Sequence, residues 1–283
     1  MVVTADDFGL AREVNEAVEA AHEGGILTAA SLMVGAPATA DAVARARRLP
    51  RLRVGLHLVL VEGRPVLPPE RVPDLVDASG HFRTDLARLG TDIFLRPSVR
   101  RQVAAEIEAQ FAAYRATGLA LDHADAHQHF HLHPTVAHLM IAIGLRHGLR
   151  ALRVPIEPSS VLAAVEPATG RTLHYVTVPW AALLRRRARQ AGLRVPDAVF
   201  GLAWSGAMTG TRLCGLLDRL PDGCTEIYTH PATAGGFAGH APGYRYADEL
   251  AALMTPAAIA AARKPDITLG GYSDFDECQA QRR

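Results

Sequence analysis

Cysteine is scarce in this sequence of 283 residues. The three cysteines, Cys214, Cys224 and Cys278, are far apart and odd in number. This usage excludes a disulfide framework and a cysteine-rich metal site, and it favours a reducing compartment. An excess of one charge is lacking as well, because 30 basic and 29 acidic side chains give a net charge of +1. Composition therefore offers no case for nucleic-acid binding.

Long apolar runs are also absent. No window of about 18 uncharged apolar residues occurs, which argues against a membrane-spanning helix. The opening MVVTADDFGL has no basic segment followed by an apolar one, so no secretory signal is expected. We expect a cytoplasmic protein, and contact with the inner face of the membrane is left open.

The residues that are present are typical of a globular domain. Apolar residues make up 49% of the chain and charged residues 21%, close to the usual globular composition. A chain of 283 residues is near the upper limit for one hydrophobic core. We therefore expect a single domain over residues 1–283.

Short apolar segments alternate with segments of helical period. The sequence predicts strands at residues 2–5, 26–34, 53–60, 119–124, 149–154, 224–229 and 267–269. It predicts helices at residues 14–24, 38–49, 97–118, from 134 onward, 179–191, 213–220 and 246–262. This alternation implies parallel strands, and their number favours a closed or nearly closed β/α barrel over an open sheet. Two long stretches, 61–96 and 192–208, are expected to lie over the carboxyl ends of the strands as lids or walls.

Acidic and imidazole side chains follow four of the predicted strands. They are the pair Asp6-Asp7, then His57, then the run from Asp125 to His131, and finally His230. Ligands of β/α folds bind at the carboxyl ends of the strands, where these side chains would meet. The sequence therefore predicts a functional site at this edge.

The pair Asp6-Asp7 favours metal-assisted hydrolysis. In an extended segment the two side chains point to opposite sides, so one can ligate a metal while the other stays free as a base. The alternative is that one carboxylate caps the following helix. Similarly, His57 lies among apolar neighbours and could be a core histidine rather than a ligand.

The segment HADAHQHFHLHP contains five histidines at alternate positions, and a strand would place all five on one face. Only one or two of them can reach a single ion, and a histidine-rich loop is the alternative. An Asp-His-His set fits Zn²⁺ or another first-row ion, with Mg²⁺ less natural but open. His230 could serve as a general acid across the pocket or be an ordinary loop histidine.

Together, VVTADDFGL, VNEAVEAA, GILTAASLMV, VGLHLVL, DAHQHFHLHP and YTHPA resemble the YdjC-type carbohydrate deacetylases over nearly the whole chain. LRVGLHLVLVEGRPVLPP and LRALRVPIEP resemble the hopanoid-biosynthesis (HpnK-type) branch. The resemblance implies a distorted, incomplete TIM-like barrel and one divalent metal ion held by Asp7, His57 and His127. It implies Asp6 as the general base and His230 as the acid. It also implies contacts to the substrate or the ligands from Asp125, His129, His131 and Arg153.

The leading hypothesis is a metal-dependent hydrolase that removes the N-acetyl group from an N-acetylglucosaminyl glycolipid, a hopanoid intermediate. One alternative is deacetylation of soluble N-acetylated oligosaccharides such as chitobiose, and another is a non-catalytic sugar- or lipid-binding protein. A metal-dependent phosphoesterase is a further alternative, but the sequence has no phosphate-binding glycine-rich loop and no lysine cluster. The partner is thus a small glycolipid or amino sugar, and homo-oligomers are left open. Apolar residues of the long loops (Val66, Leu67, Val72, Leu75, Val76, Val199, Phe200, Leu202 and Trp204) could wall a lipid tail. The arginines at residues 185–187 could contact an anionic membrane surface.

Overall fold

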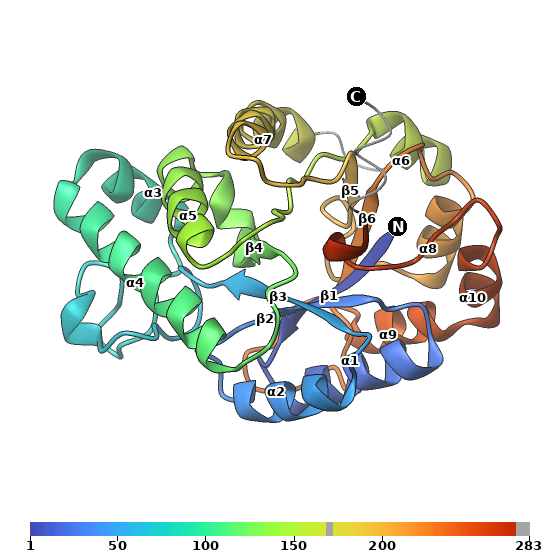
Figure 1. Ribbon diagram of the computed structural model, residues 1–283, viewed down its shortest axis with the longest axis horizontal. Helices are drawn as coiled ribbons and strands as arrows, with labels where there is room; N and C mark the ends of the chain where they lie inside the picture. Colours follow the sequence, from blue (N-terminus) through green and yellow to red (C-terminus); the bar gives the residue numbers. More distant parts are fainter. Residues whose placement is uncertain (168–171, 276–283) are drawn as a thin grey trace.

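One parallel sheet of six strands forms the centre of the protein. The computed structural model describes residues 1–167 and 172–275 (Figure 1). The strands lie in the order β4-β3-β2-β1-β6-β5. Their bounds are β1 Val2–Phe8, β2 Ala29–Leu32, β3 Arg53–Leu58, β4 Ala124–Ala126, β5 Ala198–Phe200 and β6 Thr225–Thr229. All seven residues of β1 are buried, as expected for a central strand of a parallel sheet.

The sheet curls toward a barrel that its six strands do not close. The edge strands β4 and β5 are bridged by an extended segment, residues 150–156. The Arg153 amide donates to the Ala124 carbonyl (3.0 Å), and the Val199 amide donates to the Ile156 carbonyl (3.0 Å). The expected incomplete β/α barrel is thereby confirmed.

Helices surround the strands (Figure 1). The longer ones are α1 Arg12–Gly24, α2 Thr39–Arg48, α3 Leu86–Leu95, α4 Pro97–Ala116, α5 Pro134–Arg146 and α7 Thr172–Gln190. The shorter ones are α6 Ser159–Val165, α8 Gly210–Leu217, α9 Tyr246–Met254 and α10 Pro256–Ala262. Helices α4 and α5 begin with a proline at the first turn, where the missing N–H has no intrahelical role. Helix α4 buries one apolar face that includes Val103, Ile107 and Phe111.

Two predicted strands are absent, and one real strand was not predicted. Residues 149–154 form only isolated bridges, one between Leu152 and Ala124 and one between Ala151 and Arg194. Residues 267–269 are not a strand; the carbonyl of Thr268 only accepts from the amino group of Met1 (2.6 Å). Conversely, β5 lies inside the predicted loop 192–208. A three-residue strand is too short to leave a periodic pattern.

The long stretches contribute to the core as well as to the surface. Residues 61–96 contain α3 and a short 3₁₀ turn, Pro69–Arg71. Val72 and Leu75 are completely buried, and Phe200 belongs to β5 inside the barrel. These side chains cannot wall a lipid tail, because packing in the protein already covers them. Whether 1–283 acts as a single domain stays a prediction.

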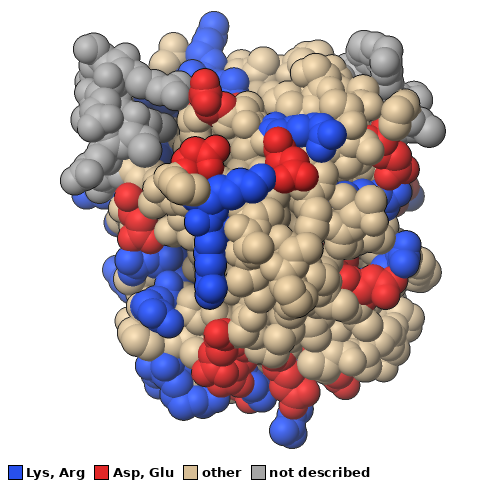
Figure 2. Space-filling view, turned by 90° about the vertical axis from the view of Figure 1, so that its right-hand side faces the viewer, with Lys and Arg blue, Asp and Glu red and all other residues tan. Residues whose placement is uncertain are grey.

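Helix α7 begins before the predicted start and contains Pro179. Its basic run fastens the helix to its neighbours: Arg185 donates to the carbonyl of Asp197 (2.6 Å) and Arg187 to that of Pro134 (2.8 Å). The guanidinium groups of these two arginines therefore already form hydrogen bonds within the protein. On the face shown in Figure 2, basic and acidic side chains lie beside one another.

The sequence argues against two features, a membrane-spanning helix and a disulfide framework. Within the described residues, no helix combines the length and apolarity needed to cross a membrane. Cys214 and Cys224 take part in no disulfide there, and Cys278 lies outside the described residues.

Candidate active site

A cavity of about 670 Å³ lies at the carboxyl ends of β1, β3, β4 and β6. We call it the central cavity. Its lining includes Asp6, Asp7, His57, Glu62, His127, Gln128, His129, Tyr228, His230, Tyr244 and Tyr246. The side chains from the four predicted strand ends therefore meet in one place, as the carboxyl-end rule predicts.

The end of β1 directs both aspartates into this cavity. Asp7 has a left-handed backbone (φ +59°), and the register between β1 and β2 shifts between Ala5 and Phe8. Gly9 follows with φ +97°, and a Cβ there would approach the Met33 carbonyl to 3.2 Å. This bulge turns the adjacent carboxylates toward the same cavity. The expectation that they point to opposite sides is wrong, because it assumed regular extended backbone.

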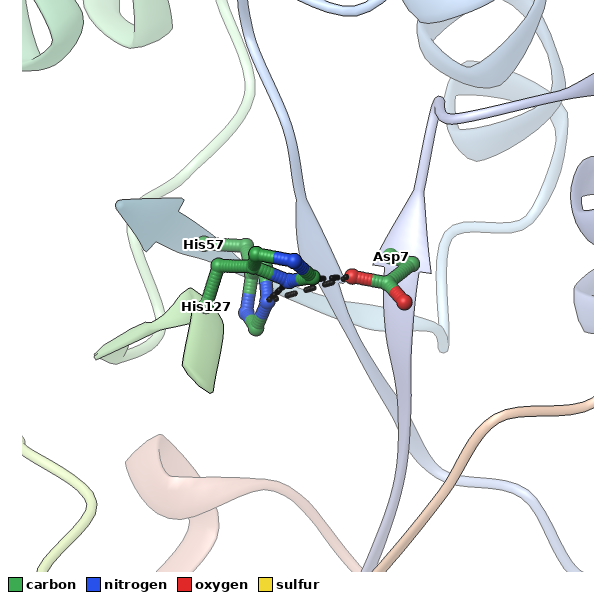
Figure 3. A group of neighbouring side chains, drawn as sticks. All are labelled: Asp7, His57 and His127. Carbon is green, nitrogen blue, oxygen red and sulfur yellow. Dashed lines mark hydrogen bonds and ion pairs between the residues drawn. The ribbon is translucent and has the colours of Figure 1, made fainter. Parts of the chain in front are cut away.

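Asp7, His57 and His127 converge from three elements (Figure 3). Asp7 Oδ1 is 3.3 Å from His57 Nε2 and 3.1 Å from His127 Nδ1. His57 Nε2 is 3.4 Å from His127 Nδ1. Ligands of a tetrahedral Zn²⁺ at 2.0–2.1 Å lie roughly 3.3 Å from one another, so this triangle has the size of a metal site.

Each histidine of this cluster is oriented by a carboxylate on its other nitrogen. His57 Nδ1 is 2.8 Å from Asp125 Oδ1, and His127 Nε2 is 3.4 Å from Glu62 Oε2. Such partners fix the tautomer and leave the opposite nitrogen free to ligate. The donor atoms, two imidazole nitrogens and one carboxylate oxygen, therefore fit a first-row ion.

Charge pairing governs protonation in the cluster without a metal. Burial alone would raise the pKa of Asp7, but His127 and His57 hold it well below its usual range. Burial would lower the pKa of His57, but the charge of Asp125 and its hydrogen bond raise it to about 10. For His127, the neighbouring Asp7 overcomes burial and raises the pKa to about 9. The metal-free cluster thus holds protons where a cation would fit.

Arg153 is completely buried among three carboxylates. It donates to both oxygens of Asp6 (2.7 and 2.8 Å) and to Glu226 (2.8 and 3.0 Å), and it forms an ion pair with Asp125 (2.6 Å). The side chain of Tyr272 also donates to Glu226. Arg153 therefore holds Asp6 in one orientation at the cavity wall.

A second group could also hold an ion by distance, namely Asp6, His57 and Asp125. Arg153 already supplies the cation of this group, and Asp125 occupies His57 Nδ1. The group containing Asp7 has no such occupant among the described residues, so it is the better metal site.

The histidine run does not continue as a strand. Strand β4 ends at Ala126, and a 3₁₀ segment, His127–Leu132, follows, with Gln128 and His129 in left-handed conformation (φ +54° and +50°). The expectation of five histidines on one face is wrong, because alternation stops where this backbone turns.

The remaining histidines of the run have separate positions. His123 lies in the core, and His133 accepts from the Thr135 amide at the start of α5. His129 Nε2 lies 2.8 Å from the Tyr228 hydroxyl at the cavity. His131 is buried with Nε2 3.0 Å from the Arg153 carbonyl. Burial lowers the pKa of both His129 and His131, so they are neutral at pH 7.

His230 follows β6 and lines the central cavity. Its backbone amide donates to Glu249, which also accepts from the Met208 amide (2.7 Å). The ring packs against Tyr244 with centroids 5.0 Å apart. Among the described residues, its Nδ1 has no hydrogen-bond partner. A histidine ring that lines a cavity can exchange a proton with a bound substrate.

Strained backbone is concentrated at this cavity. Within the described chain, four residues other than glycine have positive φ: Asp7, Glu62, Gln128 and His129. All four line the central cavity. Such conformations cost roughly 1–3 kcal/mol each and persist mainly where function requires them.

Sequence reasoning missed several cavity residues. On β6, Glu226 and Tyr228 face the same interior as His230, so strand alternation counted back from His230 could have found them. Tyr244, Tyr246 and Glu62 lie in loops or at a helix start, where no periodic signal marked them.

The family model described as YdjC-like protein matches residues 1–264. A carbohydrate deacetylase of Geobacillus stearothermophilus is 31% identical over 278 residues, covering 97% of each chain. A human carbohydrate deacetylase is 34% identical over 254 residues, covering 82% of this chain and 74% of its own.

A solved structure from Enterococcus faecalis V583, named as a candidate cellobiose-phosphate cleavage protein, shares the fold. Its TM-score is 0.75 at 24% identity, with 97% of each chain covered. The family model matches most of the chain, and the relative from Geobacillus stearothermophilus covers nearly its full length. The chain belongs to the YdjC-like protein family.

Proposed function

We propose that this protein is a metal-dependent N-deacetylase of N-acetylated sugars. The observation that carries the proposal is the Asp7–His57–His127 triangle, with Asp6 held beside it in the same cavity. The full-length relative from Geobacillus stearothermophilus, a carbohydrate deacetylase, supports the reaction and the substrate class. A binding protein would need neither a metal-sized cluster nor a second buried carboxylate at its side.

In this proposal Asp7, His57 and His127 hold one divalent ion. Their donor atoms favour Zn²⁺, although Mg²⁺ or another first-row ion could also bind. When bound, such an ion polarises an amide carbonyl and lowers the pKa of water. Asp125 and Glu62 keep the two imidazoles in the ligating orientation.

Asp6 is the proposed general base. Arg153 binds both of its oxygens, yet each carboxylate oxygen has a second lone pair that can take a proton from the attacking water. The guanidinium also keeps the carboxylate from rotating. Proton transfer of this kind contributes roughly 10²–10⁴-fold to the rate.

His230 is the proposed general acid. The amide nitrogen must gain a proton before it leaves as an amine, and the imidazole of His230 lines the same cavity as Asp6 and the cluster. Glu249 holds the backbone of His230 in place. A protonated ring can donate to the departing nitrogen and is restored by the proton that Asp6 acquired.

The cavity offers tyrosine rings to a sugar. Tyr228, Tyr244 and Tyr246 line it, and aromatic faces pack well against the apolar C–H faces of a pyranose. The two long stretches contribute Glu62 and Leu86, and Leu202 and Ser205, respectively. We therefore propose residues 61–96 and 192–208 as walls of the substrate site.

For the substrate itself we propose an N-acetylglucosaminyl glycolipid of the hopanoid type. This choice rests on the resemblance of LRVGLHLVLVEGRPVLPP and LRALRVPIEP to that branch of the family. Soluble N-acetylated sugars such as chitobiose are the alternative, which relatives named carbohydrate deacetylases support equally well.

Substitution of the proposed base tests the reaction. Asp6→Asn keeps the size of the side chain and two hydrogen-bonding atoms, so the metal content should stay near one ion per chain. Acetate release from N-acetylglucosaminides should fall by roughly 10²–10⁴-fold. Ser79→Ala, at an exposed loop outside the cavity, is the control. Unchanged acetate release by Asp6→Asn would contradict the role of Asp6.

A further inference from the structure

A second cavity adjoins the central one and has a different character. We call it the side cavity; its volume is about 330 Å³. Apolar side chains form most of its wall: Leu10, Met33, Ala36, Pro37, Val59 and Ala238. Three residues, Glu62, His127 and Gly239, line both cavities. The two cavities are therefore neighbours that share part of their wall beside the Asp7–His57–His127 cluster.

The central cavity favours an uncharged substrate. Asp6, Asp7 and Glu62 line it, and among the described lining residues there is no lysine or arginine. The nearby guanidinium of Arg153 is fully buried and is already bound by three carboxylates. Away from the proposed metal ion, a phosphate in this cavity would lose its hydration and meet carboxylates, with no lysine or arginine among the described lining residues to pair with.

The side cavity offers little to a charged group either. Arg64 is its one arginine or lysine among the described lining residues; it is exposed and donates to His81 (3.1 Å). Burial of an apolar group against such walls favours its binding, because apolar surface is removed from water. If only water filled the side cavity, the apolar side chains of Leu10, Met33 and Val59 would stay in contact with water, which is unfavourable.

We propose that the side cavity binds a hydrocarbon group of an uncharged amino-sugar substrate while the amide lies at the Asp7–His57–His127 cluster. This inference rests on the proposed function and narrows its substrate class. The hydrocarbon is attached at one of two positions next to the amide. One is the glycosidic oxygen, on the sugar carbon beside the one that carries the amide; the other is the acyl carbon of the amide itself.

Matched synthetic substrates test the proposal on the full-length, metal-loaded protein. The reference is methyl N-acetylglucosaminide. One arm carries a hexyl group at the glycosidic oxygen, a second carries N-hexanoyl in place of N-acetyl, and a third carries a 6-phosphate. We expect kcat/KM to rise at least tenfold for one hexyl arm, about the effect of burying two methylene groups. We expect it to fall at least about tenfold for the phosphate arm.

Filling the side cavity should remove the gain. Ala36→Phe and Ala238→Phe place a ring in it from opposite segments, so one can serve if the other folds poorly. Each should return the favoured hexyl substrate to the rate of the methyl reference, which itself should change little. Ala44→Phe, on the exposed face of α2 and outside both cavities, is the matched control and should keep the gain.

The possible failures are distinguishable. Equal kcat/KM for methyl and hexyl substrates in both arms, or preference for the phosphate, would overturn this inference while leaving deacetylation intact. A gain that survives both filling variants would also overturn it. No release of acetate from the methyl reference with Zn²⁺, Mg²⁺ or Mn²⁺ would instead overturn the proposed function.

Discussion

Two buried aspartate–histidine pairs in this protein look alike and lie in different settings. Asp125 Oδ1 is 2.8 Å from His57 Nδ1, and Asp122 Oδ2 is 2.9 Å from His123 Nδ1. His57 directs Nε2 at Asp7 and the central cavity. His123 directs Nε2 at the Ser31 hydroxyl (3.1 Å) inside the core. The difference lies in what the second nitrogen faces.

The core pair is part of the packing. The ring of His123 stacks on Tyr272 with centroids 4.6 Å apart, and a Cβ on Gly55 would approach the ring to 2.6 Å. Its nitrogens already have partners, so this ring has no free atom to offer a ligand. A buried histidine beside an aspartate is therefore not by itself a sign of catalysis; the informative feature is a second ring nitrogen that faces other potential metal ligands at a cavity.

The largest effect is expected from replacing the two histidines in turn. His57→Gln should lose the metal and reduce kcat/KM by roughly 10³-fold or more, because it removes a ligand of the proposed ion. His123→Gln should lower the free energy of unfolding by about 1–3 kcal/mol and change kcat/KM by less than about tenfold. Metal analysis, acetate release and denaturant unfolding measure these effects.

Replacing the aspartate of each pair, Asp125 or Asp122, should have a smaller effect than replacing the histidines. Asp125→Asn should weaken metal binding by roughly 10–100-fold, because the amide no longer fixes His57 as the carboxylate does. Asp122→Asn should leave metal affinity unchanged and lower stability, since Asp122 also accepts from the amides of Tyr272 and Ser273. Equal loss of metal affinity in both variants would contradict the distinction between the pairs.

The last expected effect is on the pH dependence of stability. The folded pKa values of His57 and His127, about 10 and about 9, lie above the ordinary value of 6.5. The metal-free folded state therefore binds more protons than the unfolded state, and stability should fall as pH rises from about 7 to 10. Metal affinity should rise over the same range, because ligation displaces these protons.

Thermal unfolding with and without Zn²⁺ across this pH range would measure both trends. His57→Gln is the control, since one of the two raised groups is gone and the decline should be shallower. Burial would lower the pKa of His123, but Asp122 raises it, so His123→Gln should also make the decline shallower. A metal-free protein whose stability rises from pH 7 to 10 would contradict the assigned protonation.

Several features could be predicted from the sequence for clear physical reasons. The helix faces of α1 and α4 follow apolar spacing, and α4 and α5 begin where a proline opens a helical segment. The strand-end positions of Asp7, His57 and His230 follow from short apolar runs that each end in a polar residue. The expected strand at residues 267–269 and the missed β5 are both three residues long, too short for periodicity to decide.

Other features of the site had no local signal. Arg153 comes from an irregular segment 147 residues away from Asp6, and nothing in its neighbourhood indicates three carboxylate partners. Glu62 reaches His127 from a loop. The side cavity is built from segments near residues 10, 36, 59 and 238, which are apolar or small for many possible reasons.

By itself, the sequence determined the alternation of strands and helices and the polar residues at the strand ends, because both follow from the chemistry of neighbouring positions. Only the tertiary structure decided which imidazole nitrogens face one another and Asp7 at the cavity. That outcome depends on the left-handed backbone at Asp7 and Gln128 and on carboxylates brought in from distant segments. Local patterns place a side chain on a strand, whereas its partners are chosen by the packing of the whole barrel.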